Sequence, residues 1–276
     1  MTVALSAPAL PAGQGRHPAL RVLGYMLLRY KKTWRGTLTE SFLYPLFFLV
    51  GMGIGLGHLV NQHVASTHQA TGFGGASYVM FIAPGVLAAT AMQLSVGEST
   101  YPVLGGIRWE RTYHAMLAAP IRVRDILSGQ LCWVGLRVAA SSAIFLAIMA
   151  AFGDVRSLLA VLALPAAVLT GLAFAAPITA FAATREQDNS FAILFRLGII
   201  PLFLFSGTFF PITQLPGWLQ LIARITPLYQ AVELCRGLVL GGEGALDALA
   251  HMAYLVALLV IGVAAGRITF ERRLAQ

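Results

Sequence analysis

Blocks of uncharged, apolar residues recur along this chain, and each is close to the length that an α-helix needs to cross a bilayer, about 20 residues. Only 11% of the 276 residues are charged and 58% are hydrophobic, whereas a soluble domain carries about 25% charged residues. The sequence therefore predicts an all-α integral membrane protein with six transmembrane helices, at about residues 41–58, 78–96, 130–152, 158–183, 191–205 and 251–266.

Lysine and arginine are unevenly distributed between the blocks. Of 19 such residues, 14 lie before the first block, after the second, after the fourth or after the sixth, 3 lie in the alternate loops, and Arg137 and Arg196 lie inside blocks. Because cytoplasmic loops accumulate Lys and Arg, we expect six crossings with both termini in the cytoplasm. The net charge of +8 then reflects membrane orientation, and no nucleic acid partner is predicted.

The chain before the first block divides into two parts. Residues 1–17 are predicted to be a disordered cytoplasmic tail. Residues 19–36 are predicted to form an amphipathic interface helix that lies on the inner leaflet with its cations on anionic headgroups. Its alternatives are a simple positive-inside anchor and a helix that also touches a cytoplasmic partner. The apolar face is Leu20, Leu23, Leu27, Tyr30 and Trp34, and the cations opposite are Arg21, Arg29, Lys31, Lys32 and Arg35.

The loop after the second block, residues 105–130, mixes charged and aromatic side chains. A short amphipathic helix here would project its polar face into the cytoplasm, where mixed charge with aromatics favours a protein contact over a lipid contact. An ordinary solvated loop is the alternative. The candidate contact residues are Arg108, Trp109, Glu110, Arg111, Tyr113 and His114.

Three charges fall at membrane depth, where each costs about 2.5–3.5 kcal/mol. We expect Arg137 and Arg196 to extend to the inner headgroups, and Glu98 pairing with one of them is an alternative. His58, His63 and His68 lack the acidic or thiol companions of a metal site, so no metal is predicted. The two cysteines, at positions 132 and 235, are predicted to be free thiols.

The stretch FSGTFFPITQLPGW, residues 205–218, breaks the helix after the fifth block and yet stays apolar. Neither of the segments that follow is long enough to span, and non-helical backbone at membrane depth must be buried in protein or face water. We expect re-entrant outer helices over residues 209–240 that form an outer gate. A packed outer loop is the alternative. The gate residues are Phe209, Phe210, Pro211 and Trp218.

Three stretches carry a resemblance to a known family: FIAPGVLAATAMQ (81–93), RTYHAMLAAPIRVRDILSGQ (111–130) and PLFLFSGTFFPITQLPGWLQLIARITPLYQAVELCRGL (201–238). They resemble the membrane subunits of type-2 ABC exporters, closest to bacterial lipo-oligosaccharide (nodulation-factor) export permeases, with drug-resistance permeases as near relatives. The resemblance implies one transmembrane domain over residues 18–276 in a bacterial cytoplasmic membrane. It also implies a pair of such subunits, expected to be a homodimer, and two separate ATPase subunits that bind ATP and Mg.

The resemblance further assigns roles to segments. It implies that residues 19–36 are a connecting helix, that Arg108–Leu117 is a coupling helix seated in the ATPase, that residues 209–240 are re-entrant, and that the second and fifth spans line the path. The expected cargo is an amphiphilic or lipid-linked molecule such as a lipo-oligosaccharide, a glycolipid or a hydrophobic drug.

Motifs in the chain itself agree with a transport subunit that performs no covalent chemistry and holds no cofactor. There is no GxxxxGK[ST] phosphate loop, so ATP hydrolysis is assigned to another chain, and no catalytic residue is predicted. An integral membrane lipid-modifying enzyme would need clustered Asp, His or Glu. An ion-coupled secondary transporter would favour two matched halves with broken helices. Both remain alternatives.

Overall fold

The computed structural model describes residues 18–32, 34–35, 43, 46–51, 55, 77–153, 157–242 and 244–274. Within these ranges the regular secondary structure is helical and includes no strand, which confirms the all-α prediction. The predicted tail, residues 1–17, lies outside the described residues. So does most of the first predicted span, of which residues 46–50 are helical.

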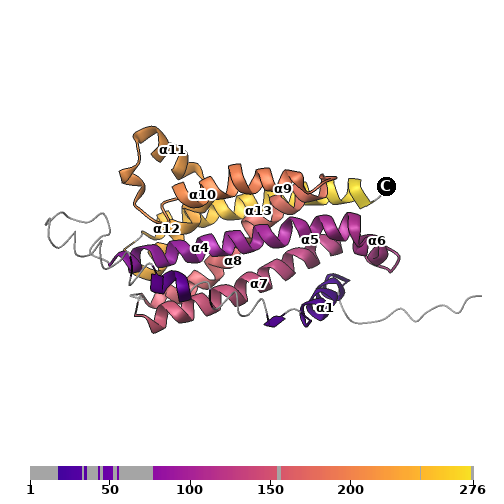
Figure 1. Cartoon of the computed structure of the whole chain (residues 1–276), viewed down its shortest axis with the longest axis horizontal. Helices are drawn as coiled ribbons and strands as arrows, with labels where there is room; N and C mark the ends of the chain where they lie inside the picture. The colour runs from indigo at the N-terminus through magenta and orange to yellow at the C-terminus, as the bar shows by residue number, and fades with distance from the viewer. Residues whose placement is uncertain are drawn as a thin grey trace, which may run out of the picture.

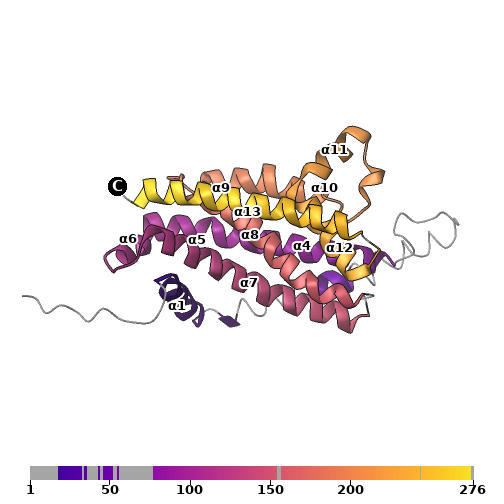
Figure 2. The same ribbon diagram turned by 180° about the vertical axis from the view of Figure 1, so that it is seen from behind.

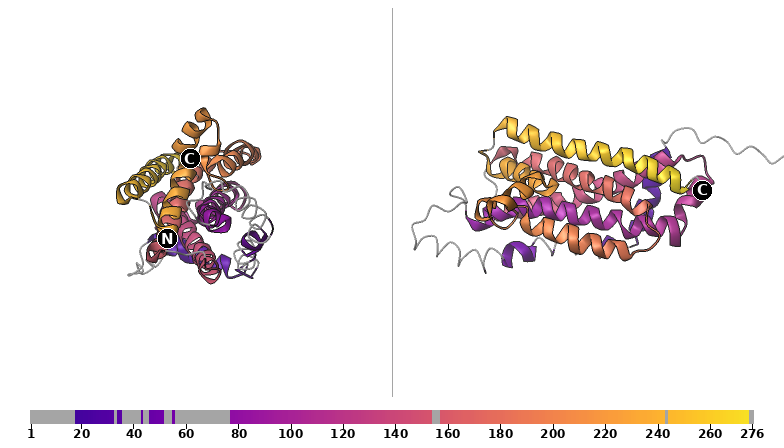
Figure 3. Two further views of the ribbon diagram at one scale, coloured as in Figure 1. Left: turned by 90° about the vertical axis from the view of Figure 1, so that its left-hand side faces the viewer. Right: turned by 90° about the horizontal axis from the view of Figure 1, so that it is seen from above.

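Four helices in the described ranges are long and apolar enough to cross a membrane, and they match the second, third, fourth and sixth predicted spans. They run side by side in an elongated bundle (Figures 1 and 3). The four stretches are Tyr78–Trp109, Val123–Ala151, Leu159–Ala183 and Ala245–Leu274. A shorter apolar helix, Asn189–Phe205, occupies the fifth predicted span.

These stretches are subdivided by changes of helix type. The first comprises α4 (Tyr78–Ser99), α5 (Tyr101–Leu104) and the π-helix η2 (Gly105–Trp109). The next three are α7 (Val123–Ala151), η3 with α8 (Leu158–Leu162, Ala163–Ala183), and α13 (Ala245–Leu274). The shorter one comprises α9 (Asn189–Ile193), the π-helix η4 (Leu194–Ile199) and α10 (Ile200–Phe205).

The core of the bundle is built around α4. Of the most apolar window of Tyr78–Trp109, 72% is buried, against 11% for α13, so α4 lies inside and α13 outside. Small residues let the helices approach closely, as is common in membranes. At Gly262 of α13, a Cβ atom would lie 2.5 Å from Cδ of Pro177 in α8, which excludes any larger residue unless the helices move apart.

Helix α1 (Pro18–Tyr30) packs on α7 through Val22, a residue outside the predicted apolar face. Val22 is buried and seats against Gly129, where a Cβ would lie only 2.6 Å away. Of the predicted apolar face, Leu20 and Leu27 are 49% and 41% exposed, whereas Leu23 and Tyr30 pack against the core. The contact of this helix with the inner leaflet stays a prediction. The glycine of α7 receives a branched side chain, and this contact rotates the helix so that the two leucines stay outside the protein core.

The two ends of the bundle carry different elements. The short helix α6 (Thr112–Leu117), α1 and the end of α13 gather at one end, whereas α11 (Gly217–Ile225) and α12 (Pro227–Leu240) lie at the other (Figures 1 and 2). Helix α7 begins seven residues before the predicted start of its span. The Asp125 carboxylate accepts a hydrogen bond from the Arg122 backbone N–H at 2.9 Å, which caps this extended start.

Candidate functional site

The predicted contact loop forms the turn between the helical stretch Tyr78–Trp109 and α7. Arg108 and Trp109 end the π-helix η2, which closes with wider turns than an α-helix. Arg111 then adopts a left-handed conformation, with φ of 52°, and reverses the chain into α6. Tyr113 and His114 lie in α6.

This segment turns one of its six predicted contact residues inward. The ring of Tyr113 is 3% exposed and lies against Gly106, where a Cβ would come within 2.9 Å of Cζ. Its hydroxyl donates to Oε1 of Gln130 at 3.2 Å, and burial raises the pKa of this phenol above its usual range. Tyr113 therefore anchors the turn, while the other five residues are exposed. We call these five, Arg108, Trp109, Glu110, Arg111 and His114, the exposed turn.

Helix α1 is joined directly to the exposed turn. Arg29 makes a two-pronged contact with Glu110, with both N–O distances 2.6 Å. The hydrogen bond to Glu110 is the main reason that the pKa of Arg29 is raised. The two side chains are 58% and 44% exposed, so the pair contributes only about 0–1 kcal/mol to stability. Its importance is geometric, because it ties the helix on the surface to the turn.

The other predicted cations of the interface helix do not make this contact. Lys31 and Lys32 come directly after α1, in a short turn where both are exposed. The guanidinium of Arg35 lies 5.8 Å from the ring of Trp34.

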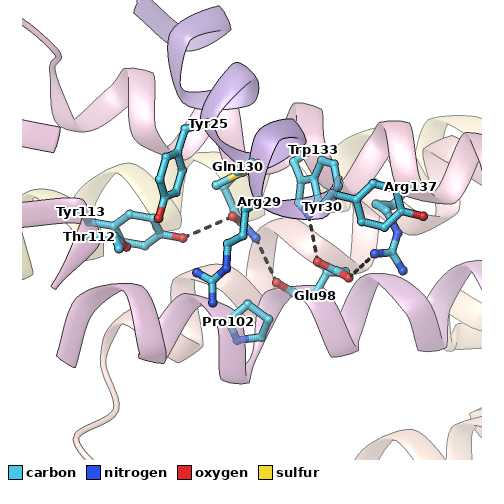
Figure 4. Close-up of a pocket in the computed structure, with 11 residues that line it drawn as sticks. Tyr25, Arg29, Tyr30, Glu98, Pro102, Thr112, Tyr113, Gln130, Trp133 and Arg137 are labelled. Atoms are coloured by element: carbon cyan, nitrogen blue, oxygen red, sulfur yellow. Dashed lines mark hydrogen bonds and ion pairs between the residues drawn. The ribbon is translucent and has the colours of Figure 1, made fainter. Parts of the chain in front are cut away.

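A polar pocket of about 200 Å³ lies between α1, α4, α6 and α7 (Figure 4). At its floor, Oε1 of Glu98 is 3.1 Å from Nη1 of Arg137. The indole N–H of Trp133 donates to Oε2 of Glu98 at 2.9 Å, and the amide of Gln130 donates to the Glu98 carbonyl at 2.9 Å. The guanidinium of Arg137 also lies 5.0 Å from the Tyr30 ring.

The pocket decides between the two expectations for the intramembrane charges. Arg137 pairs with Glu98 and its side chain is only 13% exposed, so it does not extend freely to the headgroups. Arg196 instead lies exposed on η4, and within the described residues no ion pair involves it. Sequence reasoning missed Gln130 and Trp133, although the spacing of residues 130, 133 and 137 places all three on one face of a helix.

These contacts form a continuous series from the exposed turn into the bundle. Tyr113 of α6 contacts Gln130 of α7, Gln130 contacts Glu98 of α4, and Glu98 contacts Arg137 of α7. The series links the loop after the second span to α4 and α7 through side-chain contacts.

The predicted gate residues lie at the opposite end. Phe209 contacts Phe203 with ring centroids 4.9 Å apart, and Trp218 on α11 is 68% exposed. Phe210 and Pro211 are partly buried. Sequence reasoning missed Arg236 of α12, whose Nη2 donates to the Gly207 carbonyl at 2.8 Å.

Potential metal ligands and thiols are scattered over the described part of the chain. It holds no group of three or more His, Cys, Asp or Glu residues that could bind a metal ion. His58, His63 and His68 lie outside the described residues. Cys132 is exposed, Cys235 is buried, and the two are not bonded.

Comparison with known proteins gives a consistent family. The ABC-2 type transporter family matches residues 21–240. Nodulation protein J of Rhizobium leguminosarum bv. trifolii is 32% identical over 271 residues, which cover 98% of this chain and 98% of that protein. Nodulation protein J of Rhizobium meliloti (strain 1021) is 31% identical over 84% of each chain, and that of Neorhizobium galegae is 29% identical over 99% of each.

Proposed function

The chain belongs to the ABC-2 type transporter family, and on this premise we propose that it is the permease of an ATP-driven exporter whose exposed turn docks a separate ATPase subunit. The observation that carries the proposal is the construction of the turn. Five exposed charged or aromatic side chains are held at one end of the bundle by the buried Tyr113 and by the Arg29–Glu110 pair.

The construction explains how ATP would drive transport without chemistry in this chain. ATP and Mg bind to the ATPase subunits, and closure of the ATPase pair moves the exposed turn. The contacts from Tyr113 through Gln130 to Glu98 pass that movement to α7 and α4. No residue of this chain forms or breaks a covalent bond in this scheme.

The proposed topology has six crossings with both termini in the cytoplasm, within one domain over residues 18–276. Residues 41–58 and 191–205 supply the first and fifth crossings. Residues 1–17 are the cytoplasmic tail. Helices α11 and α12 have 9 and 14 residues, fewer than the roughly 20 needed to span, which supports a re-entrant gate at the outer end.

The proposed cargo is an amphiphilic or lipid-linked molecule, with a lipo-oligosaccharide as the first candidate. The relatives are named nodulation proteins, and the resemblance to nodulation-factor exporters points the same way. The working unit is two permease subunits, proposed to be two copies of this chain, with two ATPase subunits in the bacterial cytoplasmic membrane.

The test is to co-express the chain with an ABC ATPase subunit of the same bacterium and to measure co-purification and ATP hydrolysis in lipid nanodiscs. We expect the double variant Glu110→Ala, Arg111→Ala to lower both the amount of co-purified ATPase and the rate of ATP hydrolysis at least tenfold. Arg224→Ala, an exposed arginine at the opposite end, should leave both unchanged. Arg29→Ala breaks the same ion pair without removing a residue of the exposed turn, so its loss should be smaller.

Full retention of complex and coupled hydrolysis by the double variant would refute the docking assignment. Transport by the purified chain alone, driven by an ion gradient, would favour the secondary-transporter alternative.

A further inference from the structure

A second cavity, of about 790 Å³, opens beside the exposed turn and shares no residue with the polar pocket. Three separate parts of the chain build it. The turn contributes Arg108, Trp109, Arg111 and His114, the segment after α8 contributes Glu186, and the last turn of α13 contributes Arg273. The end of the sixth predicted span therefore lies next to the turn that follows the second.

The cavity carries an excess of positive charge. Three arginines line it against the single carboxylate of Glu186. Nη1 of Arg273 is 3.7 Å from Oε1 of Glu186, beyond hydrogen-bond reach. Within the described residues, no ion pair involves Arg108 or Arg111. Cations brought together in this way repel one another unless an anion lies between them.

One nitrogen of Arg273 lies beneath the wall of the cavity, out of contact with solvent. Nη2 of Arg273 is buried and has no hydrogen-bond partner, although buried polar groups in proteins are nearly always paired. Guanidinium groups bind carboxylates and phosphates with paired, charge-assisted hydrogen bonds. The excess of arginines around the cavity therefore favours an anionic oxygen that comes from another molecule and meets their exposed nitrogens.

We propose that this cavity receives an acidic side chain of the ATPase subunit, which Arg111 and Arg273 bind together. The inference rests on the proposed function and extends the docking surface from the turn to the end of α13. Trp109 is 60% exposed beside the cavity, and an exposed tryptophan next to arginines is typical of protein interfaces. The carboxylate of Glu186 makes the site less suitable for a doubly charged phosphate.

The consequence is mechanical. A single carboxylate held between Arg111 and Arg273 would pull on η2 and on α13 together, so one docking contact would move the ends of two membrane helices. The exposed turn alone reaches only the helices on either side of it.

The experiment uses the full chain in nanodiscs and the same ABC ATPase subunit, with the dissociation constant as the readout. Arg273→Glu should weaken binding at least tenfold. Arg272→Glu is the matched control, because Arg272 is exposed, adjacent and absent from the cavity lining, and it should change binding less than twofold. Glu186→Gln removes the competing carboxylate and should tighten binding severalfold. One Asp→Lys or Glu→Lys change on the ATPase should restore binding to Arg273→Glu.

Arg273→Gln, which removes the charge without reversing it, provides a second weakened variant if Arg273→Glu does not fold. Equal effects of Arg273→Glu and Arg272→Glu, with wild-type binding intact, would overturn the cavity assignment and leave the proposed function standing. A difference between them that disappears in nanodiscs of neutral phosphatidylcholine would assign the cavity to a lipid headgroup and also overturn it. Failure of the wild-type chain to bind or stimulate the ATPase would overturn both.

Discussion

At the scale of single residues, the pair of Glu98 and Arg137 shows how charges are accommodated at membrane depth. An isolated charge there costs about 2.5–3.5 kcal/mol. Here Glu98 contacts Arg137 and also accepts from the Trp133 indole, while Arg137 lies near the faces of two aromatic rings. Within the described residues Glu98 and Arg137 form an ion pair only with each other, so removing one leaves the other without an opposite charge.

This arrangement predicts a non-additive pair. Glu98→Leu should lower the free energy of unfolding by about 3–5 kcal/mol, because it leaves Arg137 buried without its counter-charge. The double variant Glu98→Leu, Arg137→Leu should recover most of that loss. Thermal unfolding in detergent measures both, with Arg124→Leu, an exposed arginine, as the control. Additive losses in the double variant would contradict the pairing.

The sequence could locate these charges and offer their pairing as an alternative, but it could not identify their neutral partners. Glu98 and Arg137 stand out because charges are rare inside apolar blocks. Gln130 and Trp133 are neutral and raise no such signal, and their role depends on which face of α7 meets α4. The same limit applies to Arg236, whose partners Phe81 and Gly207 are remote in sequence.

At the scale of elements, helix α1 could be predicted from periodicity, but its packed face could not. Apolar side chains cover more than half of its circumference, so the wheel alone admits several faces. Gly129 on α7 selects the face that carries Val22, and that choice is visible only when both helices are in place. The same orientation of α1 also brings Arg29 into contact with Glu110.

The end of the helix after α10 could be predicted from the sequence, but the contacts that hold the following segment in place could not. Gly207 takes φ of +77°, a conformation that favours glycine. Arg236 of α12 then holds the break against α4: Nη2 donates to the Gly207 carbonyl at 2.8 Å and Nε donates to the Phe81 carbonyl at 3.3 Å. Glu233 pairs with the same guanidinium.

We predict that Arg236→Ala loosens the segment from Ser206 to Thr226. The change leaves two carbonyls without a donor and Glu233 without a counter-charge, and each unsatisfied buried group costs about 1–3 kcal/mol. Amide hydrogen exchange in this segment should accelerate at least tenfold. Arg224→Ala, on the exposed face of α11, serves as the control, and equal exchange in the two variants would show that Arg236 does not fasten the break.

At the scale of the whole molecule, the bundle has two chemically distinct ends. Arg29, the exposed turn and Arg273 lie at the end where α1, α6 and the end of α13 gather, and α11 and α12 lie at the other (Figure 1). Charge distribution along the chain predicted this polarity, because positive residues sort by membrane side. It could not predict that the turn and α13 meet around one cavity, which depends on how the helices pack.

The orientation of these two ends is the claim on which docking and gating both depend. It can be measured with single cysteines introduced by Trp109→Cys, Trp218→Cys or Arg272→Cys after replacement of Cys132 and Cys235. We predict that a membrane-impermeant maleimide labels position 218 in spheroplasts, and labels positions 109 and 272 only in inverted vesicles. Labelling of position 109 or 272 from outside intact spheroplasts would contradict the account.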